Sequence, residues 1–128
     1  MIPVYGFGGI VPGQKTASHC FALNGNIYKP EVNGVEGVMQ AYHESISKVE
    51  LYGPTNFACF LKYVNGYATT LQREQTQINQ KYTILLILTD GIITDLNNTI
   101  DQVVQGSSLP LSIIIVGIGE ADFDQMEQ

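Results

Sequence analysis

Residues 82–89 have the sequence Tyr-Thr-Ile-Leu-Leu-Ile-Leu-Thr, and Asp90 follows directly. An apolar run of this length without polar alternation is typical of a parallel strand that is covered on both faces. Residues 111–116 repeat the pattern as Leu-Ser-Ile-Ile-Ile-Val. Between the two runs, apolar side chains recur at helical spacing over residues 96–104. The sequence therefore predicts a β-α-β unit with a right-handed crossover.

Polar residues and glycines mark the ends of this unit. Thr94 or Asp95 could cap the helix at its N-terminus, and Gly106 could end it. Because parallel strands point the same way, Asp90 and residues 117–120 should lie at one edge of the sheet. Open α/β folds bind their ligands at that edge.

The first half of the chain contains further elements of the same class. A strand is expected at residues 2–7, and residues 20–23 are expected to form a short edge strand or hairpin partner. Apolar stripes at helical spacing predict one helix over residues 35–49 and a longer one over residues 57–78. Since no repeat or linker divides the sequence, we predict one α/β domain over residues 1–128.

The composition narrows the functional class. The chain has 128 residues, of which 45% are hydrophobic, and a net charge of -6. A chain of this length can build a core without metals or disulfides, so Cys20 and Cys59 are expected to be reduced, partly buried thiols. The acidic balance disfavours nucleic-acid binding. The apolar runs are too short to span a membrane, and the N-terminus does not resemble a secretory signal, so a cytoplasmic location is expected.

Asp90 is the strongest single candidate for chemistry. Burying a carboxylate without a partner is costly, so this side chain should face solvent, accept hydrogen bonds or bind a metal ion. From the residues alone, a functional role and a structural role in the turn after the strand are equally compatible. Thr55 lies in the segment Tyr-Gly-Pro-Thr-Asn-Phe, a rigid turn that opens a helix. Taken alone, it is best interpreted as the helix cap.

Other short motifs do not match the patterns of nucleotide-binding, metal-binding or catalytic sites. The glycine pairs at residues 6–8 and 117–119 lack the third glycine of a dinucleotide fingerprint, and residues 8–16 lack the spacing of a phosphate loop. His19 and His43 have no Cys or His at metal-ligand spacing. A hydrolase that used Asp90 with His19 would have no recognisable nucleophile beside them.

Six blocks of the sequence, taken together, resemble the von Willebrand factor A-type domain of copines. The resemblance covers nearly the whole chain, and its blocks are long and occur in the same order and at matching spacing. The blocks are Tyr5-Gly-Phe-Gly8, Ser18-His19-x-Phe21-x-Leu23-Asn24, Gly37-Val38-x-x-Ala41-Tyr42, Leu51-Tyr-Gly-Pro-Thr-Asn-Phe-Ala58, Ile84-Leu-Leu-Ile-Leu-Thr-Asp-Gly-Ile92 and Leu109-Pro-Leu-Ser-Ile-Ile-Ile-Val-Gly-Ile-Gly119.

This resemblance implies a doubly wound, mostly parallel sheet with helices on both faces. It also implies a metal-ion-dependent adhesion site, at which a divalent cation recognises protein partners. By matching the family's loops, Thr55 and Asp90 would be metal ligands. Their hard oxygen atoms suit Mg²⁺ or Mn²⁺, with water and a partner carboxylate completing the coordination shell.

The sequence departs from the family pattern at both ends. The family's first strand, with its acidic metal-binding loop, has no counterpart here, and the C-terminal strand and helix also have no match. A site of Thr55 and Asp90 has one charged ligand, so metal binding is expected to be weak or absent. The missing central strand should expose apolar surface and a gap in the sheet, where a second copy could pair and form a dimer.

The predicted function is that of a non-enzymatic, divalent-cation-modulated protein interaction module from a copine-like, calcium-dependent phospholipid-binding protein. Membrane recruitment would depend on modules outside this sequence. The alternative is the substrate-recruiting A domain of a copine-like ubiquitin ligase. The Cys and His spacing of a zinc-binding ligase module does not occur in the chain.

Overall fold

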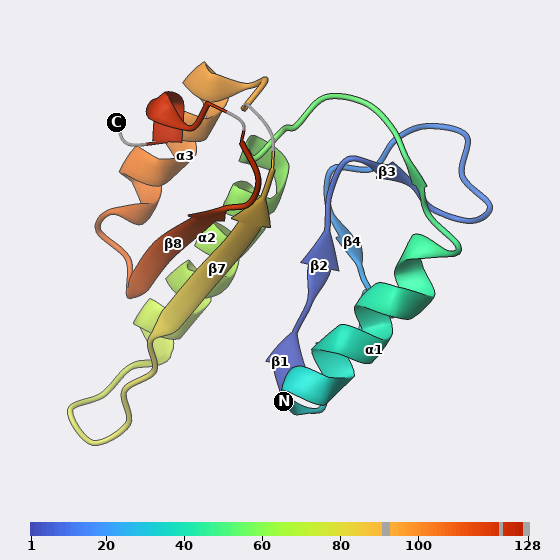
Figure 1. The fold of residues 1–128 in the computed structure, drawn as a ribbon. Helices are drawn as coiled ribbons and strands as arrows, with labels where there is room; N and C mark the ends of the chain where they lie inside the picture. The colour runs from blue at the N-terminus through green and yellow to red at the C-terminus, as the bar shows by residue number, and fades with distance from the viewer. Residues whose placement is uncertain (91–92, 121, 127–128) are drawn as a thin grey trace. The chain divides into compact units, whose positions relative to one another are not determined.

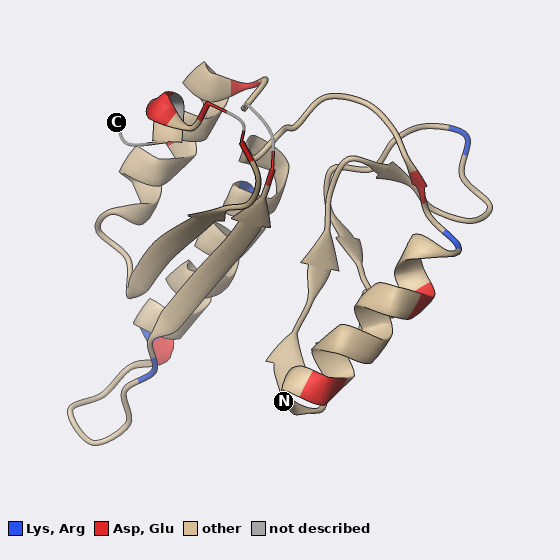
Figure 2. Cartoon of the chain, viewed as in Figure 1, with Lys and Arg blue, Asp and Glu red and all other residues tan. Residues whose placement is uncertain are grey.

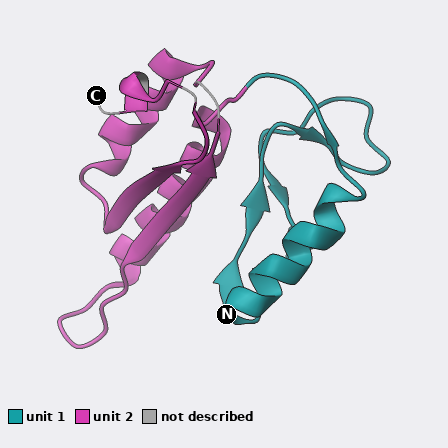
Figure 3. Ribbon diagram, in the orientation of Figure 1, with its two compact units in different colours: residues 1–54 teal, residues 55–128 magenta. Residues whose placement is uncertain are grey.

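The computed structural model describes residues 1–90, 93–120 and 122–126. In these residues the chain is a mixed α/β structure of three α-helices and short strands, coloured along the chain in Figure 1. It divides into two compact units, Met1–Pro54 and Thr55–Gln128, shown in two colours in Figure 3. The single α/β domain expected over residues 1–128 stays a prediction, and both candidate site residues belong to the second unit.

The first unit consists of short antiparallel ladders and one helix. The ladders pair β1 (Ile2–Pro3) with β5 (Glu31–Val32), β2 (Tyr5–Gly6) with β4 (Phe21–Ala22), and β3 (Gly9–Ile10) with β6 (Glu50–Leu51). The hairpin partner predicted at residues 20–23 is therefore confirmed. The strand predicted at residues 2–7 is split in two, and its partners are antiparallel.

Helix α1 (Gly34–Ile46) ends three residues before the predicted boundary. The carbonyl of Ser45 accepts the N–H groups of both Lys48 and Val49, which closes the last turn. Ala41 and Ser45 are buried. The apolar stripe that was predicted to face the core is exposed at Val35, Met39, Tyr42 and Ile46.

The second unit contains the predicted β-α-β arrangement. Its elements in chain order are α2 (Ala58–Glu74), β7 (Thr83–Thr89), α3 (Leu96–Gly106), β8 (Leu111–Gly117) and the short 3₁₀ helix η1 (Asp124–Met126). Strands β7 and β8 pair in parallel from Thr83 opposite Leu111 to Thr89 opposite Gly117. Helices α2 and α3 lie side by side on one face of this ladder (Figure 1).

The apolar face of α2 forms most of the core of the second unit. Phe57 and Leu61 are fully buried, and the rings of Phe57 and Phe60 lie with their centroids 5.2 Å apart. Ile87 of β7 and Ile93 after it are also buried. The regular spacing of apolar residues along α2 thus corresponds to the side that packs against the ladder.

The opposite face of β7 is not covered in the described structure. Ile84, Leu86 and Leu88 are 65%, 56% and 55% exposed. The expectation that the strand is covered on both faces is therefore wrong for this structure. The run lacks polar alternation, but the burial of its residues does alternate, because both neighbouring helices lie on one side.

The wide, doubly wound sheet remains a prediction. Among the described residues, the strands form four separate two-stranded ladders, and only β7 and β8 are parallel. The α/β class is confirmed, whereas helices on both faces of one sheet are not observed.

Helix α2 is shorter than its apolar stripe suggested. It ends at Glu74, and Gln75 has an extended ψ angle of 140°. The Thr76 N–H donates to the carbonyl of Asn79, and the Asn79 N–H donates to the Thr76 hydroxyl. This local turn competes with the helix for the same backbone groups. Ile78, predicted on the buried face, is 99% exposed.

Candidate functional site

Thr55 and Asp90 lie at the ends of two elements of the second unit. Asp90 directly follows β7 and is exposed, whereas Thr55 is half-buried and lies three residues before α2. Figure 1 shows the start of α2 and the carboxyl end of β7 at the same end of this unit. The Ile118 N–H donates to the Thr89 carbonyl at 2.8 Å, so the ladder is held up to the residue before Asp90. Gly91, in the predicted Thr-Asp-Gly loop, lies outside the described residues.

A reciprocal pair of hydrogen bonds joins the Thr55 loop to the segment after Asp90. The Thr55 N–H donates to the Thr94 hydroxyl at 2.9 Å, and the Thr94 N–H donates to the Thr55 carbonyl at 2.8 Å. Thr94 is only four residues beyond Asp90, and the intervening Ile93 is buried. The structure therefore places the Thr55 loop against Thr94, in the segment that follows Asp90 in the sequence.

Asp95 occupies the N-cap position of α3, as the sequence predicted, but its carboxylate also accepts hydrogen bonds from the start of α2. Its Oδ1 accepts the Phe57 N–H at 2.9 Å, and its Oδ2 accepts the Ala58 N–H at 3.0 Å. These are N–H groups at the start of α2, although Asp95 precedes α3. The Thr99 hydroxyl also donates to Asp95 Oδ1 at 3.0 Å. Asp95 thus bridges the N-terminal ends of two helices.

This arrangement changes the interpretation of Thr55. Phe57 occupies the cap position of α2, so Thr55 lies two residues too early to be the helix cap, and that prediction is wrong. Within the described residues, the hydrogen bonds of Thr55 use its backbone N–H and carbonyl, and none is made by its hydroxyl. The role expected of Thr55 is supplied by Asp95, which leaves the Thr55 hydroxyl available to a ligand.

Several acidic residues lie in the segments beyond the carboxyl ends of β7 and β8 (Figure 2). The second unit has eight acidic and three basic residues in its sequence. Glu120 follows β8 by three residues, and the Asp122 carboxylate accepts the Asp124 N–H at 3.0 Å. The summed field of such residues raises the local concentration of cations.

The donor atoms at this end suit a hard cation but are few. A threonine hydroxyl and an aspartate carboxylate are oxygen ligands of the kind that Mg²⁺ and Mn²⁺ prefer. Within residues 1–90, 93–120 and 122–126, no three His, Cys, Asp or Glu side chains are grouped so that they could hold a metal ion. Thr55 and Asp90 therefore fit a weak site in which water supplies most of the ligands.

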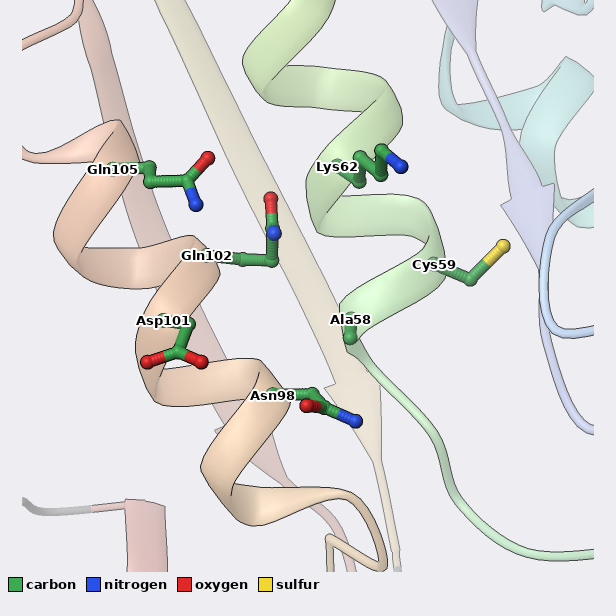
Figure 4. A pocket seen from close by; sticks show the side chains of 7 residues that line it. All are labelled: Ala58, Cys59, Lys62, Asn98, Asp101, Gln102 and Gln105. Atoms are coloured by element: carbon green, nitrogen blue, oxygen red, sulfur yellow. The ribbon is translucent and has the colours of Figure 1, made fainter.

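A second candidate is a shallow groove of about 320 Å³ between α2 and α3, which sequence reasoning did not find. Figure 4 shows the side chains that line it: Ala58, Cys59 and Lys62 from α2, and Asn98, Asp101, Gln102 and Gln105 from α3. Small-molecule sites are usually deep and largely apolar, whereas this groove is shallow and lined mostly by polar and charged side chains. Cys59 is exposed here rather than partly buried as expected, while Cys20 is half-buried.

No helix within the described residues has the length and apolar character needed to span a bilayer. The candidate site is exposed at the end of the β7–β8 ladder.

Comparison with known proteins identifies close relatives. The family model described as Copine matches residues 1–128. Copine-A of Dictyostelium discoideum is 53% identical over 126 residues, which is 98% of this chain and 20% of that protein. The chain thus spans about a fifth of the length of this curated relative.

Proposed function

The chain belongs to the copine family, and on this premise we propose that it is a non-enzymatic protein-interaction module whose binding is modulated by Mg²⁺ or Mn²⁺. Thr55 and Asp90 supply the protein ligands of the cation. A carboxylate of the partner protein completes the coordination shell, since hard cations favour oxygen donors.

The hydrogen-bonded link between the Thr55 loop and the Asp90 segment is the observation that carries this proposal. Two ligands on separate loops bind a metal well only if their relative position is fixed. The reciprocal bonds between Thr55 and Thr94 supply such a constraint, and they involve backbone atoms of Thr55. The threonine hydroxyl and the exposed Asp90 carboxylate stay available to the cation.

The acidic surroundings and the small number of ligands define how the site works. Negative side chains beyond β7 and β8 attract the cation, but one charged ligand binds it weakly. A partner carboxylate that joins the metal would add a second charge. Cation and partner binding are then mutually reinforcing, as thermodynamic linkage requires.

The longer proteins of the family carry out functions that we do not assign to this chain. Because the chain spans about a fifth of Copine-A, recruitment to membranes by calcium-dependent phospholipid-binding modules is proposed for the longer protein only. A cytoplasmic location is proposed on the same basis.

Mn²⁺ binding followed by electron paramagnetic resonance tests the proposal, because free and bound Mn²⁺ give different signal intensities. We expect weak, saturable binding that is lost in Asp90→Ala and reduced in Thr55→Ala. Asp101→Asn is the matched control, since it removes one negative charge from the exposed side of α3 without touching either loop. Saturable binding that survives Asp90→Ala would overturn the assignment of Asp90.

Addition of a short acidic peptide to the Mn²⁺-loaded chain tests the role of a partner carboxylate. Displacement of a metal-bound water by the peptide should lower the enhancement of water-proton relaxation. An unchanged enhancement at saturating peptide, with Mn²⁺ still bound, would contradict recognition through the metal.

A further inference from the structure

We propose that Thr94 and Asp95 are positioning residues that hold the Thr55 loop against the Asp90 segment in the cation-binding geometry. This inference rests on the proposed function and extends it to two residues that bind no metal themselves. We call the hydrogen bonds of Thr94 and Asp95 to the loop preceding α2 the clamp. The cation affinity of the site is proposed to depend on it.

The Asp95 carboxylate already accepts three hydrogen bonds, out of about four that a carboxylate can accept. It accepts two backbone N–H groups from the start of α2 and the hydroxyl of Thr99, at distances of 2.9 to 3.0 Å. Thr99 is buried, so its donor group is anchored in the core. A carboxylate with three such donors is better suited to orienting a loop than to coordinating a cation.

The clamp acts on consecutive residues of the Thr55 loop. Thr94 fixes Thr55 through both of its backbone groups, and Asp95 fixes Phe57 and Ala58. Helix α2 has no acidic residue in its own first turn. The negative charge at the start of α2 is supplied instead by Asp95, 38 residues after Phe57 and 37 residues after Ala58. A negative charge at a helix N-terminus is stabilising.

The other side of the clamp is anchored next to Asp90. Ile93 is buried immediately before Thr94, and Thr89 at the end of β7 accepts a hydrogen bond from Ile118. Asp90 lies between these two fixed points in the chain. The hydrogen bonds to Thr94 and Asp95 consequently hold the Thr55 loop against the segment that follows Asp90 in the sequence.

Mn²⁺ titrations of the 128-residue chain and four variants test this inference. Asp95→Asn keeps the size of the side chain but loses its charge and one acceptor oxygen, and Thr94→Val removes the acceptor for the Thr55 N–H. Each is expected to weaken Mn²⁺ binding about 10-fold, the lower end of the usual loss for residues that orient metal ligands. Thr94→Ser keeps the hydroxyl and should restore the affinity of the unmodified chain.

Asp101→Asn is the fourth variant, and it separates positioning from long-range charge. This variant also removes one negative charge, but from α3 rather than from the clamp. Its Mn²⁺ affinity should stay within about two-fold of that of the unmodified chain. Thermal unfolding of every variant is recorded in parallel without metal, so that affinities are compared only between folded chains.

The outcomes distinguish a failure of the clamp from a failure of the proposed cation-binding function. Weaker binding in Asp95→Asn and Thr94→Val, with Thr94→Ser and Asp101→Asn unaffected, supports the clamp. Unchanged affinity in Asp95→Asn and Thr94→Val, with binding still dependent on Asp90, overturns the clamp and leaves the proposed function standing. No saturable binding by the unmodified chain overturns both. An equal loss in Asp101→Asn and Asp95→Asn shows that net charge sets the affinity and overturns the positioning role of Asp95.

Discussion

Asn65 of α2 and Gly106 of α3 lie in direct contact where the two helices pack. The Asn65 Oδ1 atom is 2.6 Å from the position that a Cβ atom on Gly106 would occupy. The amide nitrogen of Asn65 donates to the carbonyl of Gln102 at 2.8 Å, which fixes the orientation of the side chain. The helices can therefore approach this closely only because residue 106 has no side chain.

Replacement of Gly106 by alanine should destabilise the chain. Alanine is the better helix former, but its methyl group would displace Asn65 or separate the helices, at a cost of about 1–3 kcal/mol. Chemical denaturation measures this change. Gly66→Ala is the matched control: its Cβ would meet nothing within 4 Å, so it should stabilise the chain by about 0.5–1 kcal/mol. Stabilisation by both substitutions would contradict the packing described here.

Truncation of the buried Phe57 side chain should destabilise the chain more than truncation of an exposed side chain. The side chain is 1% exposed and packs against Phe60. Phe57→Ala is expected to lower the free energy of unfolding by about 3–5 kcal/mol. Ile78→Ala, at a residue outside α2, should alter it by less than about 0.5 kcal/mol. A large loss at Ile78 would show that the helix extends to the boundary that its apolar pattern predicted.

The uncovered face of β7 should promote self-association. Ile84, Leu86 and Leu88 form an exposed apolar row, and among the described residues β7 pairs only with β8. We propose that a second copy pairs at this strand, because unpaired edges and apolar faces favour association. Sedimentation velocity should show an average mass that rises with concentration.

Leu86→Lys should reduce this association, because it places a charge in the middle of the apolar row. Val104→Lys introduces the same positive charge on α3, where Val104 is 64% exposed. This substitution should leave the association unchanged. A monomer at every accessible concentration, or an equal effect of both substitutions, would count against pairing through β7.

The local elements of the second unit were predictable because their signals are local. The apolar runs at residues 82–89 and 111–116 correspond to β7 and β8, and the helical spacing between them corresponds to α3. Thr94 or Asp95 could be identified as a cap because capping residues occur at fixed positions. Helix boundaries were less predictable: the turn at Thr76 ends α2 although the apolar spacing continues.

The long-range contacts of the site could not be predicted from these patterns. Nothing in the sequence spacing shows that the carboxylate of Asp95 bonds to the N–H groups of Phe57 and Ala58 in addition to the Thr99 hydroxyl of its own helix. That pairing follows from the packing of α2 beside α3. The family resemblance singled out Thr55 and Asp90, but the hydrogen bonds between Thr55 and Thr94 required the three-dimensional structure.

Which faces of the strands and helices are buried could also not be predicted from the sequence. An apolar run is compatible with a strand covered on one or on both faces, since the pattern records hydrophobicity and not the number of neighbouring layers. The exposed stripe of α1 and the exposed row of β7 show this difference. The wider parallel sheet remains a prediction from the family resemblance.

Cation binding at Thr55 and Asp90 can be measured by thermal unfolding with and without millimolar Mn²⁺, for the unmodified chain and for Asp90→Ala. A ligand stabilises only the state that it binds, by an amount set by its concentration relative to its dissociation constant. We expect a rise in the midpoint that saturates with Mn²⁺ in the unmodified chain and is absent in Asp90→Ala. No rise in the unmodified chain, or the same rise in both, would contradict a cation site at Thr55 and Asp90.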